Sequence, residues 1–166
     1  NSAQATWQII EQPNSLTQGA GLVNKRVTHL NGNSYSIGYN YNSGNEFVVD
    51  VGNAAGNYID ASYQFSRASF STTSPNNLII VIDGQAGPGE KIRLYRNGVR
   101  ATLNGAAFDS PFAGFANTSA PLEIGRVNNG TAYYTGRILL ARAWGRALNL
   151  SEIAQVTENP SEVYDT

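Results

Sequence analysis

Hydrophobic and polar residues alternate with a period of two along much of the chain, which is the pattern of β-strands that bury one face. Two neighbouring runs show it most clearly. Their apolar positions are Tyr35, Ile37 and Tyr39 in the first run and Phe47, Val49 and Val51 in the second. The turn-forming residues 42–45 separate the runs, so we predict an antiparallel hairpin.

Short apolar stretches bounded by Gly, Pro, Asn, Asp and Ser predict further strands. These stretches are residues 5–10, 21–25, 58–65, 67–71, 78–82, 91–96, 99–103, 122–125 and 134–144. Residues 78–82 are apolar throughout and rich in β-branched side chains, which favours a buried central strand over a helix. Asn97-Gly98 lies between two extended runs and predicts a tight hairpin, because both residues tolerate positive φ.

The remaining segments complete the expected topology. A loop is expected from Pro13, and another covers residues 111–120. In the last predicted strand, strict alternation places Ile138 and Leu140 on one side and Leu139 on the other.

One helix is predicted near the C-terminus. Asn149 can cap it, Glu152 three residues later completes a capping box, and Asn159-Pro160 ends it. The expected apolar stripe is Leu150, Ile153, Ala154 and either Val156 or Thr157. Because a helix of about two turns is unstable alone, it must pack against the strands.

Composition and charge narrow the class of protein. The chain has 166 residues, enough for one domain, with 41% hydrophobic and only 14% charged residues. Its net charge of −1, with scattered Lys and Arg, gives no support for nucleic-acid binding. No apolar run approaches the roughly 18 residues of a membrane helix, so no membrane insertion is expected. There is no Cys and a single His, which excludes thiolate zinc sites.

Several ordered motifs resemble one known family. A buried run ends in Asp83-Gly84, a Leu-Tyr-x-Asn-Gly hairpin follows at 94–98, and a short strand occupies 122–125. Residues 136–153 then combine Gly, a final strand, Trp, Arg-Ala-Leu and Leu-Ser-Glu-Ile. Together with the early segment 6–25, this order is similar to laminin-G-like, concanavalin A-like domains of the bacterial or phage type.

The resemblance implies an all-β, two-sheet antiparallel jelly-roll sandwich with one short C-terminal helix, formed as a single domain by residues 1–166. Family members usually carry one or two strands before the equivalent of Trp7, whereas only a few residues precede it here. We therefore expect that strand in a longer chain or from a neighbouring chain, since the sheet would otherwise have an exposed edge.

Enzymatic chemistry finds little support in the sequence. Glucanases of this fold resemble each other in a Glu-x-Asp-x-(x)-Glu strand, which places two carboxylates on one face for a retaining mechanism. The nearest approach here is Glu46 and Asp50, which we expect to be solvated on the outer side of a strand. His29 reads as an exposed turn residue, and no nucleophile elbow or phosphate-binding loop is present. We expect no catalytic residues.

Glycan binding is the family property with candidate residues in this sequence. Sugar sites combine aromatic faces with amide or carboxyl groups, and two segments have that composition. The candidates are Tyr39, Tyr41, Asn128, Asn129, Tyr133 and Tyr134. The alternative interpretation is that the tyrosines pack on the sheet and the asparagines form turns. No metal site is assigned and no cofactor is expected, although calcium is possible because the resemblance admits it.

The leading hypothesis is a non-catalytic recognition or assembly module, displayed extracellularly or on a virus particle. Its expected partners are a glycan or protein surface, and also neighbouring copies or capsid and fibre proteins. Two alternatives stay open: a glycan-active hydrolase or lyase on the same fold, and a purely structural virion or fibre component.

Overall fold

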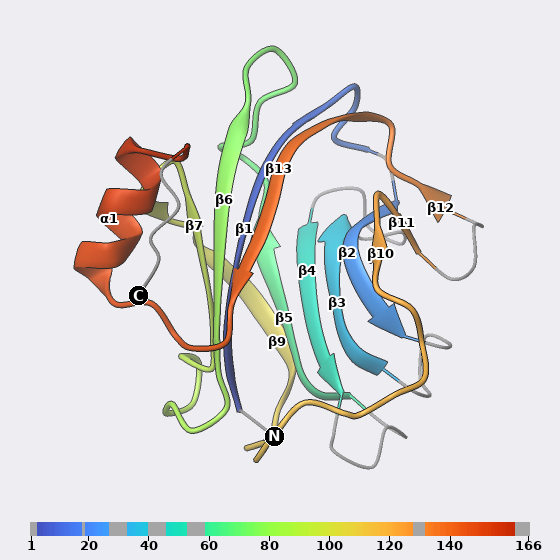
Figure 1. Cartoon of the computed structure of the whole chain (residues 1–166), viewed down its shortest axis with the longest axis vertical. Coiled ribbons are helices and arrows are strands. Elements are labelled where there is room, and N and C mark those ends of the chain that lie inside the picture. The colour runs from blue at the N-terminus through green and yellow to red at the C-terminus, as the bar shows by residue number, and fades with distance from the viewer. Residues whose placement is uncertain are drawn as a thin grey trace.

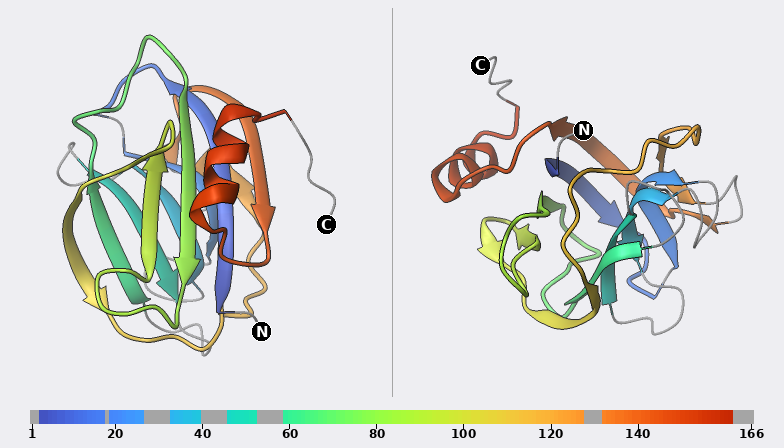
Figure 2. Two further views of the ribbon diagram at one scale, coloured as in Figure 1. Left: turned by 90° about the vertical axis from the view of Figure 1, so that its left-hand side faces the viewer. Right: turned by 90° about the horizontal axis from the view of Figure 1, so that it is seen from below.

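The computed structural model describes residues 3–17, 19–26, 33–39, 46–52, 59–127 and 132–161. Two antiparallel sheets face each other, and a helix lies on the outer side of one of them (Figures 1 and 2). The predicted all-β sandwich with a short C-terminal helix is therefore confirmed.

Five strands form the sheet that carries the helix. In spatial order they are β13 (Gly136–Trp144), β1 (Gln4–Pro13), β6 (Asn76–Asp83), β7 (Ile92–Arg96) and β8 (Val99–Arg100). The run 78–82 thus lies in a central strand, as predicted. Asn97 and Gly98 both adopt positive φ between β7 and β8, which confirms the tight hairpin.

Six strands form the facing sheet. In order they are β10 (Glu123–Ile124), β2 (Ala20–Arg26), β3 (Asn33–Tyr39), β4 (Glu46–Gly52), β5 (Ile59–Ser66) and β9 (Leu103–Asp109). The predicted hairpin is β3 with β4, in the register Ile37 opposite Val49. A separate two-stranded ladder joins β11 (Arg126–Val127) to β12 (Ala132–Tyr133).

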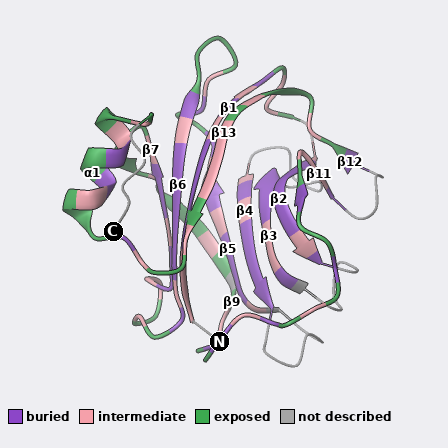
Figure 3. Ribbon diagram, viewed as in Figure 1, coloured by how far each residue is buried: buried purple, intermediate pink, exposed green. Residues whose placement is uncertain are grey.

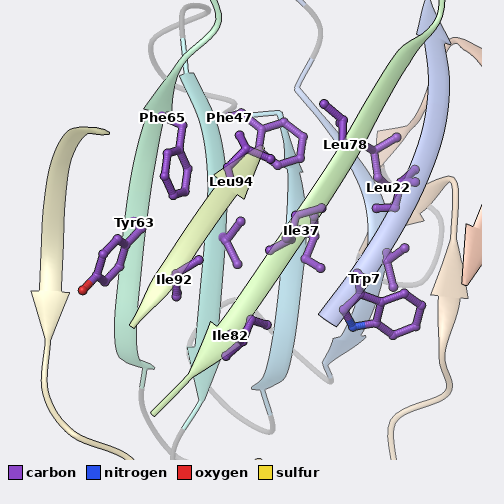
Figure 4. Packing of buried hydrophobic residues seen from close by; sticks show 14 of the residues in the cluster. Trp7, Leu22, Ile37, Phe47, Tyr63, Phe65, Leu78, Ile82, Ile92 and Leu94 are labelled. Carbon is purple, nitrogen blue, oxygen red and sulfur yellow. The ribbon is translucent and has the colours of Figure 1, made fainter. Parts of the chain in front are cut away.

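The core lies between the two sheets, where the alternating apolar side chains of both meet. Figure 4 shows Ile82, Ile92 and Leu94 of one sheet close to Ile37 and Phe47 of the other. Residues coloured as buried follow the strands in Figure 3, and exposed ones gather in loops and on the helix. A period-two sequence therefore generates a dry interior and fixes which side chains reach each outer surface.

Three boundaries differ from the expectation. Residues 67–71 form a turn rather than a strand, since the Phe70 amide donates to the Arg67 carbonyl at 2.9 Å. The first strand continues through Pro13 instead of ending before it. The run expected at 99–103 splits, because β8 ends at Arg100 and β9 then joins the opposite sheet. The last two are decided by partner strands, which a local pattern does not contain.

The faces of β13 also differ from strict alternation. Ile10 lies opposite Leu140, whereas Glu11 lies opposite Ile138, so Leu139 is the extra residue of a bulge. Ile138 packs on the core between the sheets. Leu140 pairs with Ile10, whose side chain lies on the face of β1 opposite to that of Glu11. The prediction that Ile138 and Leu140 share one side is therefore wrong.

Helix α1 (Leu150–Glu158) begins at the predicted capping box, with Asn149 accepting from the Glu152 amide and Glu152 accepting from the Asn149 amide. Its buried residues are Ile153 and Val156, which cover Ile79, Val81 and Tyr95. Leu150 is exposed, as is Ala154, so the buried stripe is narrower than predicted. Figure 2 shows the helix across the outer face of β6 and β1.

Candidate functional site

Two of the predicted glycan-binding residues are brought together, with Tyr39 buried and Tyr134 partly buried. Tyr39 and Tyr134 stack with ring centroids 6.2 Å apart and an interplanar angle of 19°. Tyr39 is only 2% exposed, which leaves it no surface for a sugar. Tyr133, by contrast, is 61% exposed. The other candidates, Tyr41, Asn128 and Asn129, lie outside the described residues.

The stacked tyrosines share one buried carboxylate, Glu11. Tyr39 Oη donates to Glu11 Oε1 at 2.9 Å, and Tyr134 Oη donates to Oε2. Asn76 Nδ2 also donates to Oε1, at 2.9 Å. Glu11 is fully buried, so its two oxygens are occupied by protein donors and not reachable by substrate. We call Glu11, Tyr39, Asn76 and Tyr134 the carboxylate cluster.

Burial dominates the electrostatics of this cluster. Desolvation raises the pKa of the Glu11 carboxyl above its ordinary value, and the hydrogen bonds from Tyr134, Tyr39 and Asn76 oppose that rise. Burial also raises the pKa of Tyr39 and of Tyr134, with the adjacent Glu11 adding to both. Both phenols therefore stay protonated and act as donors, with Glu11 as the acceptor.

A buried arginine lies beside the cluster. The Arg67 guanidinium carbon is 5.1 Å from the Tyr39 ring centroid, and the residue is only 3% exposed. Within the part of the chain that the structure describes, none of its three guanidinium nitrogens has a hydrogen-bond partner. Burial lowers the pKa of Arg67, and the attraction of Tyr39 and Glu46 opposes this. The contact with the ring face is a cation–π interaction.

The exposed candidate, Tyr133, lies on the β11–β12 ladder. Val127 and Ala132 form the buried cross-strand pair, and Arg126 and Tyr133 form the next pair. Because successive residues of a strand point to opposite faces, Arg126 and Tyr133 lie on the outward face together. We call this pair the hairpin surface. It combines an aromatic ring with a guanidinium group, both reachable from solvent.

Contacts with both sheets hold the backbone of the hairpin surface in place. The Tyr134 amide donates to the Gly125 carbonyl at 2.8 Å, and the Gly125 amide donates to the Leu22 carbonyl of β2 at 2.9 Å. Tyr134 is also bound to Glu11 of β1. Arg126 Nη2 lies 2.9 Å from the Glu123 carboxylate. Residues from both sheets thus fix the backbone that carries Tyr133, which reduces the entropy lost when a ligand binds.

The acids do not form a cleft of the glucanase kind. Glu46 accepts from Asn104 Nδ2 at 3.1 Å on the outer side of β4. Asp50 is buried rather than solvated, which corrects the expectation, because its ladder neighbours Ser36 and Ser62 flank it on both sides. Across the described ranges, no three acidic or histidine side chains come together as metal ligands. His29 lies outside those ranges.

Two residues of the site, Glu11 and Arg126, were not among the candidates from the sequence. Trp7, Ile9 and Glu11 alternate, so the period of β1 already points Glu11 inward. Arg126 and Tyr133 flank an Asn-Asn-Gly segment, which is a hairpin signal that would have paired them across a ladder. Both signals are local. The meeting of Glu11 with Tyr39 and Tyr134 has no local signal.

The fold and the site define a class of protein, a two-sheet jelly-roll domain with an anchored aromatic surface and a buried carboxylate. The family model described as the concanavalin A-like lectin/glucanases superfamily matches residues 3–154. The chain belongs to this family. No curated protein matches it in sequence.

Solved structures of several binding proteins share the fold. A family 40 carbohydrate-binding module of a Ruminococcus gnavus sialidase, bound to α2,3-sialyllactose, aligns with TM-score 0.67 at 15% identity over 94% of this chain and 83% of that one. Domain 4 of a Geobacillus stearothermophilus arabinanase, in complex with arabinotriose, aligns with TM-score 0.55 at 19% identity over 95% and 68%.

A Bacteroides ovatus protein described as carbohydrate-binding aligns with TM-score 0.66 at 14% identity over 92% of this chain. This chain spans 40% of that protein. At these identities the likeness shows the fold alone. No helix within the described part of the chain has the length and apolar character needed to span a bilayer.

Proposed function

We propose that this domain is a non-catalytic glycan-binding module and that the hairpin surface of Arg126 and Tyr133 is its contact site. The observation that carries the proposal is the anchored, 61% exposed ring of Tyr133 beside a guanidinium group. Aromatic rings pack against the apolar faces of sugars, and arginine donates to their oxygens in a fixed geometry.

The family membership and the binding modules that share the fold support this proposal. The carboxylate cluster also supports the proposal. Its buried acid, Glu11, holds the hairpin in place through Tyr134 and cannot be reached by a substrate. Display outside the cell or on a virus particle, as an adhesion or decoration module, stays a prediction.

The experiment is a binding screen followed by two matched variants. The purified domain is screened against an immobilised oligosaccharide panel that includes arabinotriose and α2,3-sialyllactose. Tyr133→Ala is then compared with Phe108→Ala, which removes another exposed aromatic side chain from strand β9. Loss of one stacking ring is expected to weaken binding about tenfold or more, since aromatic contacts contribute on the order of 1 kcal/mol beyond area burial.

Two outcomes contradict the proposal. One is a domain that binds no oligosaccharide of the panel. The other is equal binding by Tyr133→Ala and Phe108→Ala. Turnover of a polysaccharide by the domain, lost in Glu46→Gln, would instead favour the hydrolase or lyase alternative.

A specific observation also favours an assembly role as a second candidate. In the described part of the sheet, the nine-residue strand β13 pairs with β1 alone and forms the sheet edge. Such an edge can accept a further strand. Sedimentation velocity of the domain over a range of concentrations tests this, and a monomer at every concentration would contradict self-assembly through β13.

A further inference from the structure

A cavity lies apart from the hairpin surface, where the end of β5 meets the β7–β8 hairpin. It has a volume of about 340 Å³. Its lining includes Ser66, Ser69, Arg96, Arg100 and Thr102. Strand β7 and strand β12 lie on opposite sides of the molecule (Figure 1), so this cavity and Tyr133 are separate places. Two of the lining residues are arginines and none is acidic.

Arg96 is positioned by a neutral partner. Its Nε donates to Asn76 Oδ1 at 2.8 Å, and its guanidinium carbon lies 6.0 Å from the Phe70 ring centroid. Asn76 is fully buried and is itself held by Glu11 and by the Ser71 carbonyl. Within the described ranges, Asn76 is the one hydrogen-bond partner of the Arg96 side chain and bonds only its Nε, while Arg96 itself lines the cavity.

Arg100 is held differently. Its Nη2 donates to both oxygens of Glu90, at 2.7 and 2.8 Å, and this ion pair is about half exposed. Glu90 therefore balances the charge of Arg100. Glu11 attracts Arg96 electrostatically, and both side chains bond to Asn76. Among the described residues, however, no carboxylate forms an ion pair with Arg96, in contrast to Arg100 and Glu90.

The hydroxyl groups at the rim complete a donor set. Ser69 and Thr102 are both exposed, and Ser66 is partly exposed. A planar guanidinium matches the two oxygens of a carboxylate, and neighbouring hydroxyl groups can donate to the same oxygens. A neutral sugar offers no such pair of charged oxygens.

We propose that this cavity binds a carboxylate, with Arg96 as the anchoring residue and Ser69 and Thr102 as additional donors. This goes beyond the hairpin surface, because the site is on another part of the molecule and its ligand class is acidic. The carboxylate can belong to an acidic sugar such as a uronic acid or to a free small acid, and the test separates these sources.

The test uses trigalacturonate, neutral galactotriose and acetate as probes of the whole domain. Binding is measured by calorimetry, and the Nε–Hε NMR signals of Arg96 and Arg100 report the place of binding. Trigalacturonate is expected to bind about tenfold or more tightly than galactotriose and to shift the Arg96 signal, because a charge-assisted hydrogen bond outweighs a neutral one. Equal binding per carboxylate by acetate would assign the site to free acids rather than sugars.

Two variants keep the result interpretable if Arg96 is needed for folding. Ser69→Glu places a negative charge at the cavity rim on an exposed residue and is expected to weaken trigalacturonate binding at least about tenfold by like-charge repulsion. Ala154→Glu adds the same charge on the exposed side of α1 and is expected to leave binding unchanged. Arg96→Lys keeps the charge but loses the planar fork, so weaker binding is expected.

The proposal is overturned if neither trigalacturonate nor acetate binds, or if Ser69→Glu binds trigalacturonate as well as the unchanged domain. Tyr133→Ala separates the two sites. If it abolishes trigalacturonate binding while Ser69→Glu does not, the acid binds at the hairpin surface and the cavity assignment is wrong. If trigalacturonate binds at the cavity but Tyr133→Ala does not weaken binding to any oligosaccharide of the panel, the proposed function fails while this inference stands.

Discussion

A single buried carboxylate organises the polar contacts at one end of this sandwich. Glu11 receives hydrogen bonds from Tyr39, Asn76 and Tyr134, residues of three different segments. An ionised group without such donors would cost several kcal/mol to bury. The same contacts that satisfy Glu11 also fix Tyr134, and through it the exposed ring of Tyr133. The hydrogen bonds that satisfy the Glu11 carboxylate therefore also position the candidate site.

The raised pKa of Glu11 predicts a pH effect on stability. The folded state binds the Glu11 proton more tightly than the unfolded chain, whose carboxyl keeps the ordinary value of 4.5. Between pH 4.5 and the raised pKa the folded state therefore carries more protons, so the free energy of unfolding falls as pH rises through this window. The stabilising contribution is fully present below pH 4.5.

The variant Glu11→Gln isolates this contribution, since an amide does not titrate. As pH rises from 4.5 to 7.5, we expect the free energy of unfolding of the unchanged domain to fall relative to that of Glu11→Gln. Urea unfolding followed by tryptophan fluorescence measures it. A difference that does not vary with pH would contradict the raised pKa.

At the scale of the element, the helix shows how a local signal and a tertiary contact cooperate. The Asn149–Glu152 capping box satisfies amide groups at the helix start, and Arg146 adds an ion pair to Glu152 at 2.6 Å. Ile153 and Val156 then cover the outer face of the five-stranded sheet. A helix this short depends on that packing, because its own hydrogen bonds do not offset the entropy of nucleation.

The cap predicts a measurable loss of stability. Asn149→Ala removes the side-chain acceptor for the Glu152 amide and should lower the free energy of unfolding by about 1 kcal/mol. Ser151→Ala, at an exposed position in the first helical turn, serves as the control and should change it by less than about 0.5 kcal/mol. Urea unfolding of both variants is the measurement, and equal stability of the two would contradict the assigned role of the cap.

At the scale of the whole molecule, stability depends on the interior between the two sheets. Ile80 is fully buried in the central strand β6, with Trp7 on one neighbouring strand and Leu94 on the other. Its side chain takes part in the main core cluster. The edges of the sheets, by contrast, carry the exposed apolar side chains Ile124, Leu139 and Phe108.

Ile80→Ala should therefore destabilise the whole domain. Removing the buried side chain leaves a cavity and should lower the free energy of unfolding by about 2–5 kcal/mol. Leu150→Ala is the matched control, because Leu150 is exposed and its truncation should change stability by less than about 0.5 kcal/mol. Thermal and urea unfolding give both values, and a small loss for Ile80→Ala would mean that this layer packs loosely.

The sequence by itself determined the elements whose signals are local. The alternation in 35–39 and 47–51 predicted the β3–β4 hairpin, and Asn97-Gly98 predicted the turn before β8. The capping box predicted the start of α1. Each signal lies within a few residues of the structure it specifies, because hydrogen bonding and backbone conformation there depend on near neighbours.

Only the tertiary structure decided which strands meet. Glu11 and Tyr134 are separated by 123 positions in the chain, yet they form one contact. The bulge at Leu139, the crossing of β9 to the other sheet and the burial of Asp50 follow from pairing with distant strands. Alternation assigns a side chain to one face of its strand, but the neighbours of that face come from elsewhere in the chain. The anchoring of the candidate site therefore depends on the meeting of both sheets, because Tyr134 beside it bonds to Glu11 of β1.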